Sequence, residues 1–425
     1  MNRSRNLKAW LRSIVAPLLL ACGVGGATAA PYLVADVETG QTLIEHDSTA
    51  PWYPASVTKL MTVYVALSAV RGGTVTLDTP LTMSVRASRV PPSKMGFRPG
   101  IEVTLGNALK MLMVKSPNDI AVMVAEGLGG SVEGFADKMN AAAAHLGLQE
   151  SHFVNPNGLQ DPTHVSSARD MAMIARALLK EFPDQSDLFS IGAIQLGRQI
   201  IMNHNGLLGH YPGADGMKTG FTCAAGFNVV ASANHNGRRL IVVVLGSPSA
   251  RERTLKAAEL FDLGFAKWGG GPTLEGLPKS AETEAPDMHG DICSRHYRAA
   301  VAAAEEELAE LSSTAAAAPA GRGAGFAVAS ASSYSDAPVH FDPVPVYVGA
   351  KSGEAAPEAA AYSAEKPAEP TALSSAARAH HRFRARDAGH ARSKSEKMAA
   401  ALAPRHPKRD PPVEAKHDSE KSTAQ

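Results

Sequence analysis

Three short polar motifs stand in order along the chain, and together they contain the residue types that a serine hydrolase needs. The motifs are Ser56-Val57-Thr58-Lys59, Ser116-Pro117-Asn118 and Lys218-Thr219-Gly220. A serine hydroxyl is a poor nucleophile unless a base lies beside it. Residues three apart on a helix face the same way, so Lys59 can act as the base for Ser56. A lysine does this only when burial or a nearby cation keeps it neutral.

The other motif residues have complementary chemistry. Lys218 can be the cation that keeps the base neutral, and Ser116 can pass a proton to a leaving amine. Asn118 can orient the base or a substrate amide. Thr219 can hydrogen-bond a substrate carboxylate, and Gly220 lets a substrate lie close to a strand. The N-terminus of the helix also offers free backbone N–H groups to developing negative charge.

Each motif alone is a weak signal, because Ser-x-x-Lys recurs at residues 363–366 and Ser-x-Asn recurs at 232–234. The order of the motifs, their spacing and the elements expected around them make the set specific. The triple is the signature of active-site serine enzymes that react with β-lactams.

The expected elements place these motifs at a helix start, a helix break and a strand. Apolar residues repeat with helical period over 57–70, and Pro117 should end one helix and let another begin. Further helices are expected at 131–145, 167–181 and 250–267, and strands at 32–37, 42–44, 199–202, 226–233 and 239–245. We predict one α+β domain over residues 32–268, with an antiparallel sheet built from N- and C-terminal strands and a helical middle.

The two ends of the chain differ from the middle. Basic residues, a short apolar run at 14–22 and then Ala27-Thr28-Ala29 predict a secretory signal peptide over residues 1–29, cleaved near Ala29. A lipoprotein signal ending at Cys22 is an alternative. Residues 273–425 are rich in Ala, Pro, Ser and charge, which predicts a low-complexity, largely disordered tail with one ordered segment at 339–349.

The cysteines, the histidines and the net charge bear on three questions: disulfide formation, metal binding and nucleic-acid binding. Export would leave two of the three cysteines, and we hypothesise a disulfide between Cys223 and Cys293. The chain has no Cys-x-x-Cys, and His145, His152 and His164 lack zinc-site spacing, so no metal or cofactor is expected. The formal net charge of +1 gives no nucleic-acid signal.

Around the three motifs the chain resembles the D-alanyl-D-alanine carboxypeptidases, the low-molecular-mass penicillin-binding proteins. The resemblance covers about residues 32–268. It is carried by Pro54–Thr62, His164–Asp170, Asn203–Leu208, Asp215–Gly220 and Ala225–Asn228. It implies a serine β-lactamase/transpeptidase-like fold.

The resemblance also implies an activity and site roles. The activity is removal of the terminal D-alanine from peptidoglycan stem pentapeptides through an acyl-enzyme on Ser56, with penicillins as covalent inhibitors. The backbone N–H groups of Ser56 and Phe221 would form the oxyanion hole. Arg253 would contact the substrate carboxylate, with Arg251 as a nearby alternative.

Two features depart from the family pattern. Pro117 stands where relatives commonly have a small flexible residue. The tail replaces the β-rich domain and amphipathic C-terminal helix of the best-known relatives, which leaves membrane attachment open.

Three other functions remain open. A β-lactamase would share the fold, but its Glu-x-x-Leu-Asn motif is absent and Asn155–Leu159 stands in that region, which predicts slow penicillin turnover. A DD-endopeptidase would use the same chemistry. A non-catalytic wall-binding protein is the third, since residues 376–425 contain 12 Lys/Arg against 6 Asp/Glu.

Overall fold

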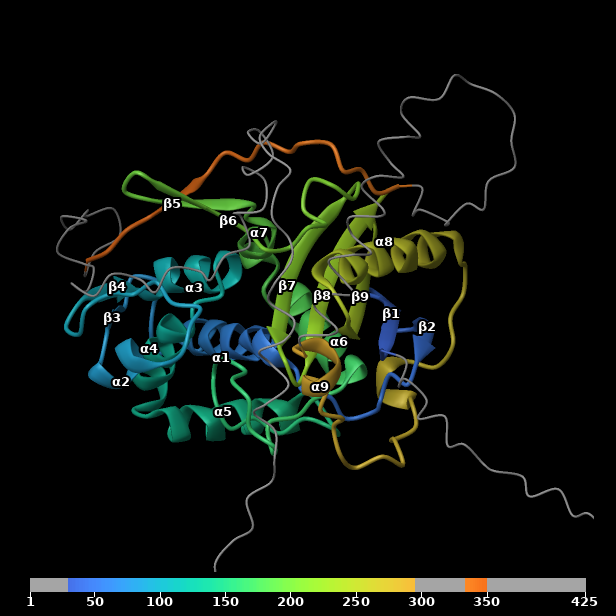
Figure 1. Ribbon diagram of the computed structural model, residues 1–425, viewed down its shortest axis with the longest axis horizontal. Helices are drawn as coiled ribbons and strands as arrows, with labels where there is room; N and C mark the ends of the chain where they lie inside the picture. The colour runs from blue at the N-terminus through green and yellow to red at the C-terminus, as the bar shows by residue number, and fades with distance from the viewer. Residues whose placement is uncertain (1–29, 295–332, 350–425) are drawn as a thin grey trace, which may run out of the picture. The chain divides into compact units, whose positions relative to one another are not determined.

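The computed structural model describes residues 30–294 and 333–349, and a five-stranded antiparallel sheet lies at its centre (Figure 1). The strand order is β2-β1-β9-β8-β7. The strands are β1 (Tyr32–Asp36), β2 (Thr42–His46), β7 (Ala214–Thr222), β8 (Gly226–His235) and β9 (Arg238–Ser247). The sheet thus combines N-terminal and C-terminal strands, as predicted for an α+β fold, and β7 forms one of its edges.

Strand β9 is apolar along most of its length because both of its faces are buried. Leu240 and Val242 pack in the cluster that contains α8 (Ala250–Ala266), whereas Ile241 and Val243 belong to the main core, which contains α6 (Ala168–Glu181). This alternation follows from the opposite directions of successive strand side chains. Asn236-Gly237 joins β8 to β9 with positive φ at both residues, as the hairpin prediction requires.

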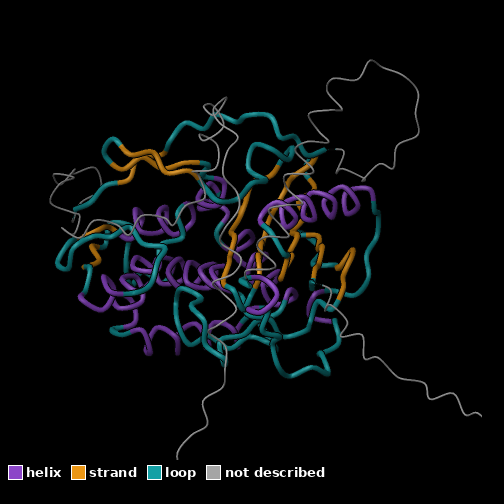
Figure 2. Tube along the Cα trace, in the orientation of Figure 1, coloured by secondary structure: helices purple, strands orange, loops and turns teal. Residues whose placement is uncertain are grey.

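Most of the helices gather beside the edge strand β7, away from β1 and β2 (Figure 2). They are α1 (Lys59–Arg71), α2 (Val85–Arg89), α3 (Leu105–Val114), α4 (Asn118–Gly129) and α5 (Val132–His145). Helix α1 is buried all round from Lys59 to Leu67, so it is the central helix of this layer. Pro117 separates α3 from α4, which confirms the predicted helix break.

Short elements complete the described structure. A two-stranded sheet pairs β3 (Pro80–Thr82) with β4 (Glu102–Thr104), and a three-stranded sheet has the order β10-β5-β6. Its strands are β5 (Ala193–Leu196), β6 (Gln199–Met202) and β10 (Val344–Val346). The remaining turns and helices are η1 (Ala55–Thr58), η2 (Pro183–Gln185), α7 (Asp187–Ser190), η3 (Leu274–Gly276) and α9 (His289–Ile292).

The packed structure extends beyond residue 268, where we expected the domain to end. Leu274, Leu277 and Ile292 are buried, and Cys223 is bonded to Cys293 across 70 residues, as hypothesised. The composition of this region is poor in large apolar residues, but the few that are present reach the core. The predicted signal peptide at 1–29 and the tail residues 295–332 and 350–425 lie outside the described residues.

The segment 333–349 also packs on the domain, at the top of Figure 1, and includes the expected ordered segment. Strand β10 pairs in parallel with β5, and Val346 and Val348 are buried. Ser335 donates its N–H to the carbonyl of His210 at 2.9 Å, and Gly349 donates to Glu102 at 2.8 Å. We call residues 333–349 the strap.

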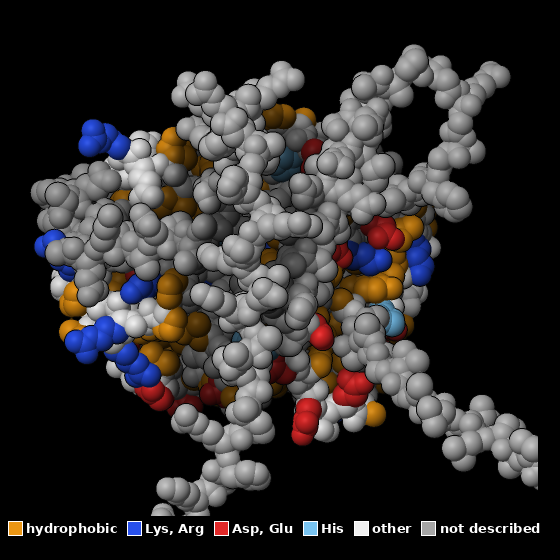
Figure 3. Space-filling view, in the orientation of Figure 1, with side chains coloured by type: hydrophobic (Ala, Val, Ile, Leu, Met, Phe, Trp, Pro, Cys, Tyr) orange, Lys and Arg blue, Asp and Glu red, His pale blue; other side chains and the backbone are white. Residues whose placement is uncertain are grey.

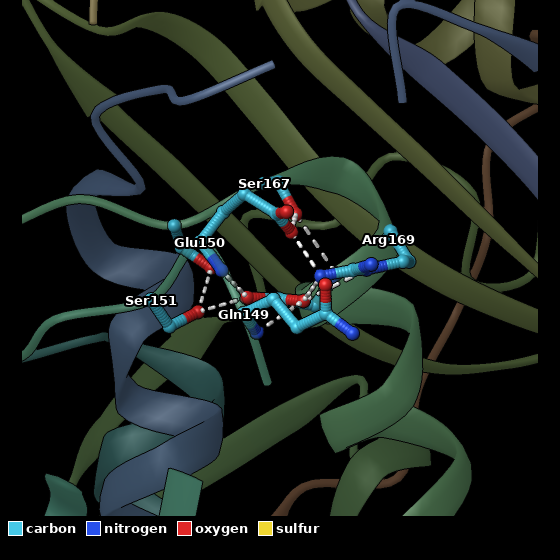
Figure 4. Close-up of polar contacts among 7 residues, drawn as sticks. Gln149, Glu150, Ser151, Ser167 and Arg169 are labelled. Atoms are coloured by element: carbon cyan, nitrogen blue, oxygen red, sulfur yellow. Dashed lines mark hydrogen bonds and ion pairs between the residues drawn. The ribbon is translucent and has the colours of Figure 1, made fainter. Parts of the chain in front are cut away.

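Arg169 and Asp170, in the first turn of α6, belong to a buried network of charged side chains. Both are fully buried, and Arg169 forms ion pairs with Glu150 and Asp170 (Figure 4). Ser167, not Asp170, caps α6 by accepting the N–H of Asp170. Asp170 instead accepts hydrogen bonds from the 149–151 loop, so this network joins the loop to the helix.

The visible surface carries charges of both signs. In Figure 3, basic side chains lie along the left margin of the described surface and acidic ones along the lower margin. Within residues 30–294 and 333–349, none of the helices has the length and apolar character that a bilayer span requires.

Candidate active site

The nucleophile segment is held from two sides. Ser56 lies in η1, directly before α1, and the preceding Ala55 has a positive φ of 49°. Asn228 on β8 donates hydrogen bonds to the carbonyls of Tyr53 and Pro54, each at 3.0 Å. On the other side Gly158 approaches so closely that a Cβ there would lie 1.8 Å from the Ala55 carbonyl oxygen. The sheet and the 155–159 loop thus fix the backbone around Ser56.

Lys59 points at Ser56 as the three-residue spacing predicts. Its Nζ lies 2.9 Å from Ser56 Oγ, and it donates to Asn118 Oδ1 at 2.9 Å and to the Asn157 carbonyl at 2.8 Å. The side chain is fully buried. Burial lowers the pKa of Lys59 well below its ordinary value, and the positive charge of Lys218 lowers it further. The position of Lys59 and the direction of its pKa shift are those that a general base beside Ser56 would need.

The middle motif faces the same amine from the α3–α4 junction. Ser116 has a φ of 60°, an uncommon conformation for a residue with a side chain, and its buried Oγ has no hydrogen-bond partner among the described residues. Asn118 is buried and donates to the carbonyls of Pro91 and Pro92 at 3.1 and 3.0 Å. These two bonds use the Nδ2 group of Asn118, which leaves its Oδ1 to accept the hydrogen bond from Lys59.

The third motif lies on the edge strand β7. Lys218 is buried and donates to the Thr219 carbonyl at 2.9 Å, and burial together with the charge of Arg253 lowers its pKa to about 7. A Cβ on Gly220 would lie 2.9 Å from the backbone nitrogen of Ser56. Glycine is therefore needed for the edge strand to approach the nucleophile.

Arg253, rather than Arg251, faces the site. Arg253 on α8 is buried, lines the same cavity as Ser56, and donates to the His204 carbonyl at 3.4 Å. Burial lowers its pKa to about 10. Arg251 pairs with Asp336 of the strap at 3.1 Å. Of the two arginines that the sequence offered as contacts for a substrate carboxylate, only Arg253 lines the cavity.

These groups surround one cavity of about 660 Å³. Its lining includes the predicted residues Ser56, Ser116, Asn118, Thr219, Gly220, Phe221 and Arg253, while Lys59 and Lys218 lie buried behind it. The lining also includes the unpredicted residues Ser93, Lys115, Asn157 and His204. None of the described residues that line this cavity is Asp or Glu.

The comparisons with known proteins agree with this geometry. Residues 24–249 match the D-alanyl-D-alanine carboxypeptidase family, and all three motifs fall within this range. The chain belongs to this family. D-alanyl-D-alanine carboxypeptidase DacA of Haemophilus influenzae is 36% identical over 253 residues, which cover 58% of this chain and 64% of that protein. The chain therefore spans less than two thirds of that relative's length.

Solved structures of family members share the fold. Penicillin-binding protein 5 from Haemophilus influenzae superposes with a TM-score of 0.54 at 35% identity, over 56% of this chain and 71% of that chain. Penicillin-binding protein D2 from Listeria monocytogenes, in its ampicillin-bound form, superposes with a TM-score of 0.51 at 27% identity. The match covers 56% of this chain and 97% of that chain. The described α+β domain is thus a penicillin-binding protein fold.

Within this family fold, the 153–158 loop contributes contacts that sequence reasoning missed. Its Asn157 carbonyl accepts from Lys59, and Thr62 donates to the Pro156 carbonyl at 2.6 Å. Behind it, His164 Nδ1 accepts the Val154 N–H at 3.1 Å, and Nε2 lies 2.8 Å from the Thr58 hydroxyl. Burial lowers the pKa of His164 to about 4, so it is a neutral structural residue. Every residue has a backbone carbonyl, so the sequence cannot show which carbonyl will accept from a lysine. The only signal for this loop in the sequence was the turn that Gly158 indicates.

Proposed function

We propose that this protein is a serine-type D-Ala-D-Ala carboxypeptidase that removes the terminal D-alanine from peptidoglycan pentapeptides. The observation that carries the proposal is the 2.9 Å contact between Lys59 Nζ and Ser56 Oγ, made by a fully buried lysine whose pKa is strongly lowered. A neutral amine at hydrogen-bond distance from a hydroxyl is the arrangement that an activated serine needs.

The proposed reaction has two steps. Ser56 Oγ attacks the carbonyl carbon of the penultimate D-alanine while Lys59 takes its proton, and the backbone N–H groups of Ser56 and Phe221 stabilise the oxyanion. The C–N bond then breaks, Ser116 delivers a proton to the leaving amine, and an ester on Ser56 remains. Water attacks this ester, which releases the shortened peptide and restores the hydroxyl.

The remaining residues would bind and orient the substrate. Thr219 and Arg253 would hold the terminal carboxylate, and Lys218 would add positive charge from behind the strand. Asn118 would keep Lys59 directed at the hydroxyl, since its amide oxygen accepts from Nζ at 2.9 Å. Gly220 would let the substrate backbone follow β7.

Penicillins are the proposed covalent inhibitors, because they would form the same ester on Ser56. The test is acylation by a labelled penicillin of the wild type and of Ser56→Ala. We expect label on the wild type and none on the variant. An unlabelled wild type would contradict the proposal, and label on Ser56→Ala would move the nucleophile to another residue.

A β-lactamase is the first alternative, and the cavity lining argues against it. Rapid deacylation needs a group that activates water, and no described Asp or Glu lines the cavity. We therefore expect a long-lived penicilloyl ester and slow release of hydrolysed penicillin. A DD-endopeptidase would use the same residues, and the relative rates on a pentapeptide and a cross-linked dimer would distinguish the two.

We also propose that the protein works outside the cytoplasm, after cleavage of a signal peptide near Ala29. The Cys223–Cys293 disulfide supports this, because disulfides persist in oxidising compartments. N-terminal sequencing of the mature protein tests the cleavage site. Peptidoglycan is the proposed substrate there. Binding of wall polymer by the basic residues 376–425 is the non-catalytic alternative, which a chain ending at residue 349 would test.

A further inference from the structure

Lys115 is a half-buried cation in the wall of the catalytic cavity. It ends α3, one residue before Ser116, so its backbone is fixed by the same helix break that positions the middle motif. Among the described residues, its Nζ has no hydrogen-bond or ion-pair partner, whereas the Nζ of Lys59 and of Lys218 each donate to protein oxygens.

Asp119 is the acid whose charge acts on this lysine, but its carboxylate is bonded to other groups. Asp119 raises the pKa of Lys115, while burial lowers it more strongly. The Asp119 carboxylate, however, already accepts three backbone N–H groups, from Met95, Gly96 and Ile120, at 2.8 to 3.0 Å. The ammonium group of Lys115 is therefore available to a ligand in the cavity.

The cavity as a whole has an excess of positive charge. Arg253 and Lys115 line it, Lys218 lies directly behind it, and no described acid lines it to balance them. Partly desolvated cations with no acid beside them in the cavity lining form a site for an anion, and a charge-assisted hydrogen bond is the strong contact that such a site offers.

His204 lines the same cavity and is affected by the charges of all three cations. The pKa of His204 is lowered by desolvation of its ring and by the charges of Lys218, Arg253 and Lys115. Lys115 comes from the end of α3 and Arg253 from α8, and these helices lie on opposite sides of β7 in Figure 1. A carboxylate bound in this cavity could thus contact a cation from each of the two helices.

We propose that Lys115 is a substrate-binding residue that holds the terminal carboxylate of the peptide from the wall opposite Arg253. This rests on the carboxypeptidase activity proposed above. It adds a second cationic contact to a carboxylate that Thr219 and Arg253 bind from the sheet side. The contact would orient the leaving D-alanine with its amine toward Ser116, the neighbour of Lys115 in the chain.

The test compares Lys115→Gln with the wild type on two peptides ending in D-Ala-D-Ala, one with a free carboxylate and one with a carboxamide. We expect KM for the acid to rise roughly tenfold, the effect of one charge-assisted hydrogen bond of about 1.4 kcal/mol, with kcat within about twofold. KM for the carboxamide should stay unchanged, because it lacks the charge. Lys115→Arg should retain most of the affinity for the acid.

Lys110→Gln is the matched control, because Lys110 lies on the same helix but lines a different cavity. It should leave KM for both peptides unchanged. An unchanged KM in Lys115→Gln, or an equal rise for acid and carboxamide, would overturn the role of Lys115 while leaving the carboxypeptidase proposal intact. A wild type that neither cleaves the acid nor accepts penicillin would overturn both.

Discussion

The amines of Lys59 and Lys218 are both buried, and the positive charge of Lys218 lowers the pKa of Lys59. The two motifs that contain them are far apart in the sequence, so the protonation state of the base is set by tertiary structure. This relationship makes the pH dependence of acylation a test of the proposed mechanism.

Replacing Lys218 with Gln should move the acidic limb of the acylation rate to higher pH. Loss of the neighbouring charge lets the pKa of Lys59 rise toward its ordinary value, so a higher pH is needed to produce the neutral base. The measurement is the second-order rate of labelling by penicillin between about pH 5 and pH 10. The control Lys110→Gln should leave the acidic limb of the acylation rate at the same pH. If the limb also stays at the same pH in Lys218→Gln, the charge of Lys218 does not set the pKa of Lys59.

Glu150→Gln should make the stability of the protein less sensitive to pH. Burial and the charge of Asp170 raise the pKa of Glu150, because the single guanidinium of Arg169 lies between two carboxylates. A carboxyl with a raised pKa binds protons more tightly in the folded state, so wild-type stability should fall as pH rises above about 4.3 toward neutrality.

Thermal melts of wild type and Glu150→Gln between about pH 5 and pH 8 check this expectation. The variant lacks the titrating group, so its Tm should decline less over this interval. Parallel curves for the two proteins would mean that Glu150 remains ionised in the network.

Removing the disulfide should destabilise the protein without touching the catalytic residues. The bridge closes a separation of 70 residues, for which chain entropy gives about 4 kcal/mol. Cys223→Ser and Cys293→Ser should each lower Tm, and reductant should lower the Tm of the wild type to the same level. Reductant should have no further effect on either variant, and a reductant-insensitive wild type would contradict the bridge.

Gly192→Ala should loosen the strap. A Cβ on Gly192 would lie 2.1 Å from Cδ1 of Phe341, so the ring has to move, and overpacking of this kind typically costs about 1 to 3 kcal/mol. Gly290→Ala is the control, since a Cβ there has no neighbour within 4 Å. The double variant Gly192→Ala/Phe341→Ala should recover part of the loss in Tm, and strictly additive losses would disprove the contact.

Two truncations should show where the catalytic unit ends. A chain ending at residue 349 keeps the strap and should match the full chain in Tm and in penicillin labelling. A chain ending at residue 332 loses β10 and the Arg251–Asp336 ion pair, so it should melt at a lower temperature. Equal melting of the two truncations would show that the strap adds no stability.

The sequence was sufficient for the features that depend on local periodicity. The Ser56–Lys59 pair follows from the geometry of one helical turn, and the helix break follows from the backbone chemistry of Pro117. The three motifs met in one cavity because the N- and C-terminal strands share a sheet, which the pattern of elements also predicted.

Features that depend on long-range packing were missed. Arginine in a helix is usually exposed, but Arg169 is buried and pairs with Glu150 from a separate loop. Lys115 and His204 have no motif of their own, and their place in the cavity depends on where α3 and the 203–213 loop lie in the fold. The ordered segment at 339–349 was predicted, but its pairing with β5 was not, because that strand is remote in sequence.

The parallel pairing of β10 with β5 has a consequence for how the chain can be divided. The strap docks as a bound peptide does, by adding a strand to a sheet and placing Val346 and Phe341 against the domain. A protease cut between residues 294 and 333 would therefore leave the catalytic fold as two non-covalently joined pieces. The strap and the body behave as ligand and receptor within one polypeptide, so the enzyme is suited to fragment complementation.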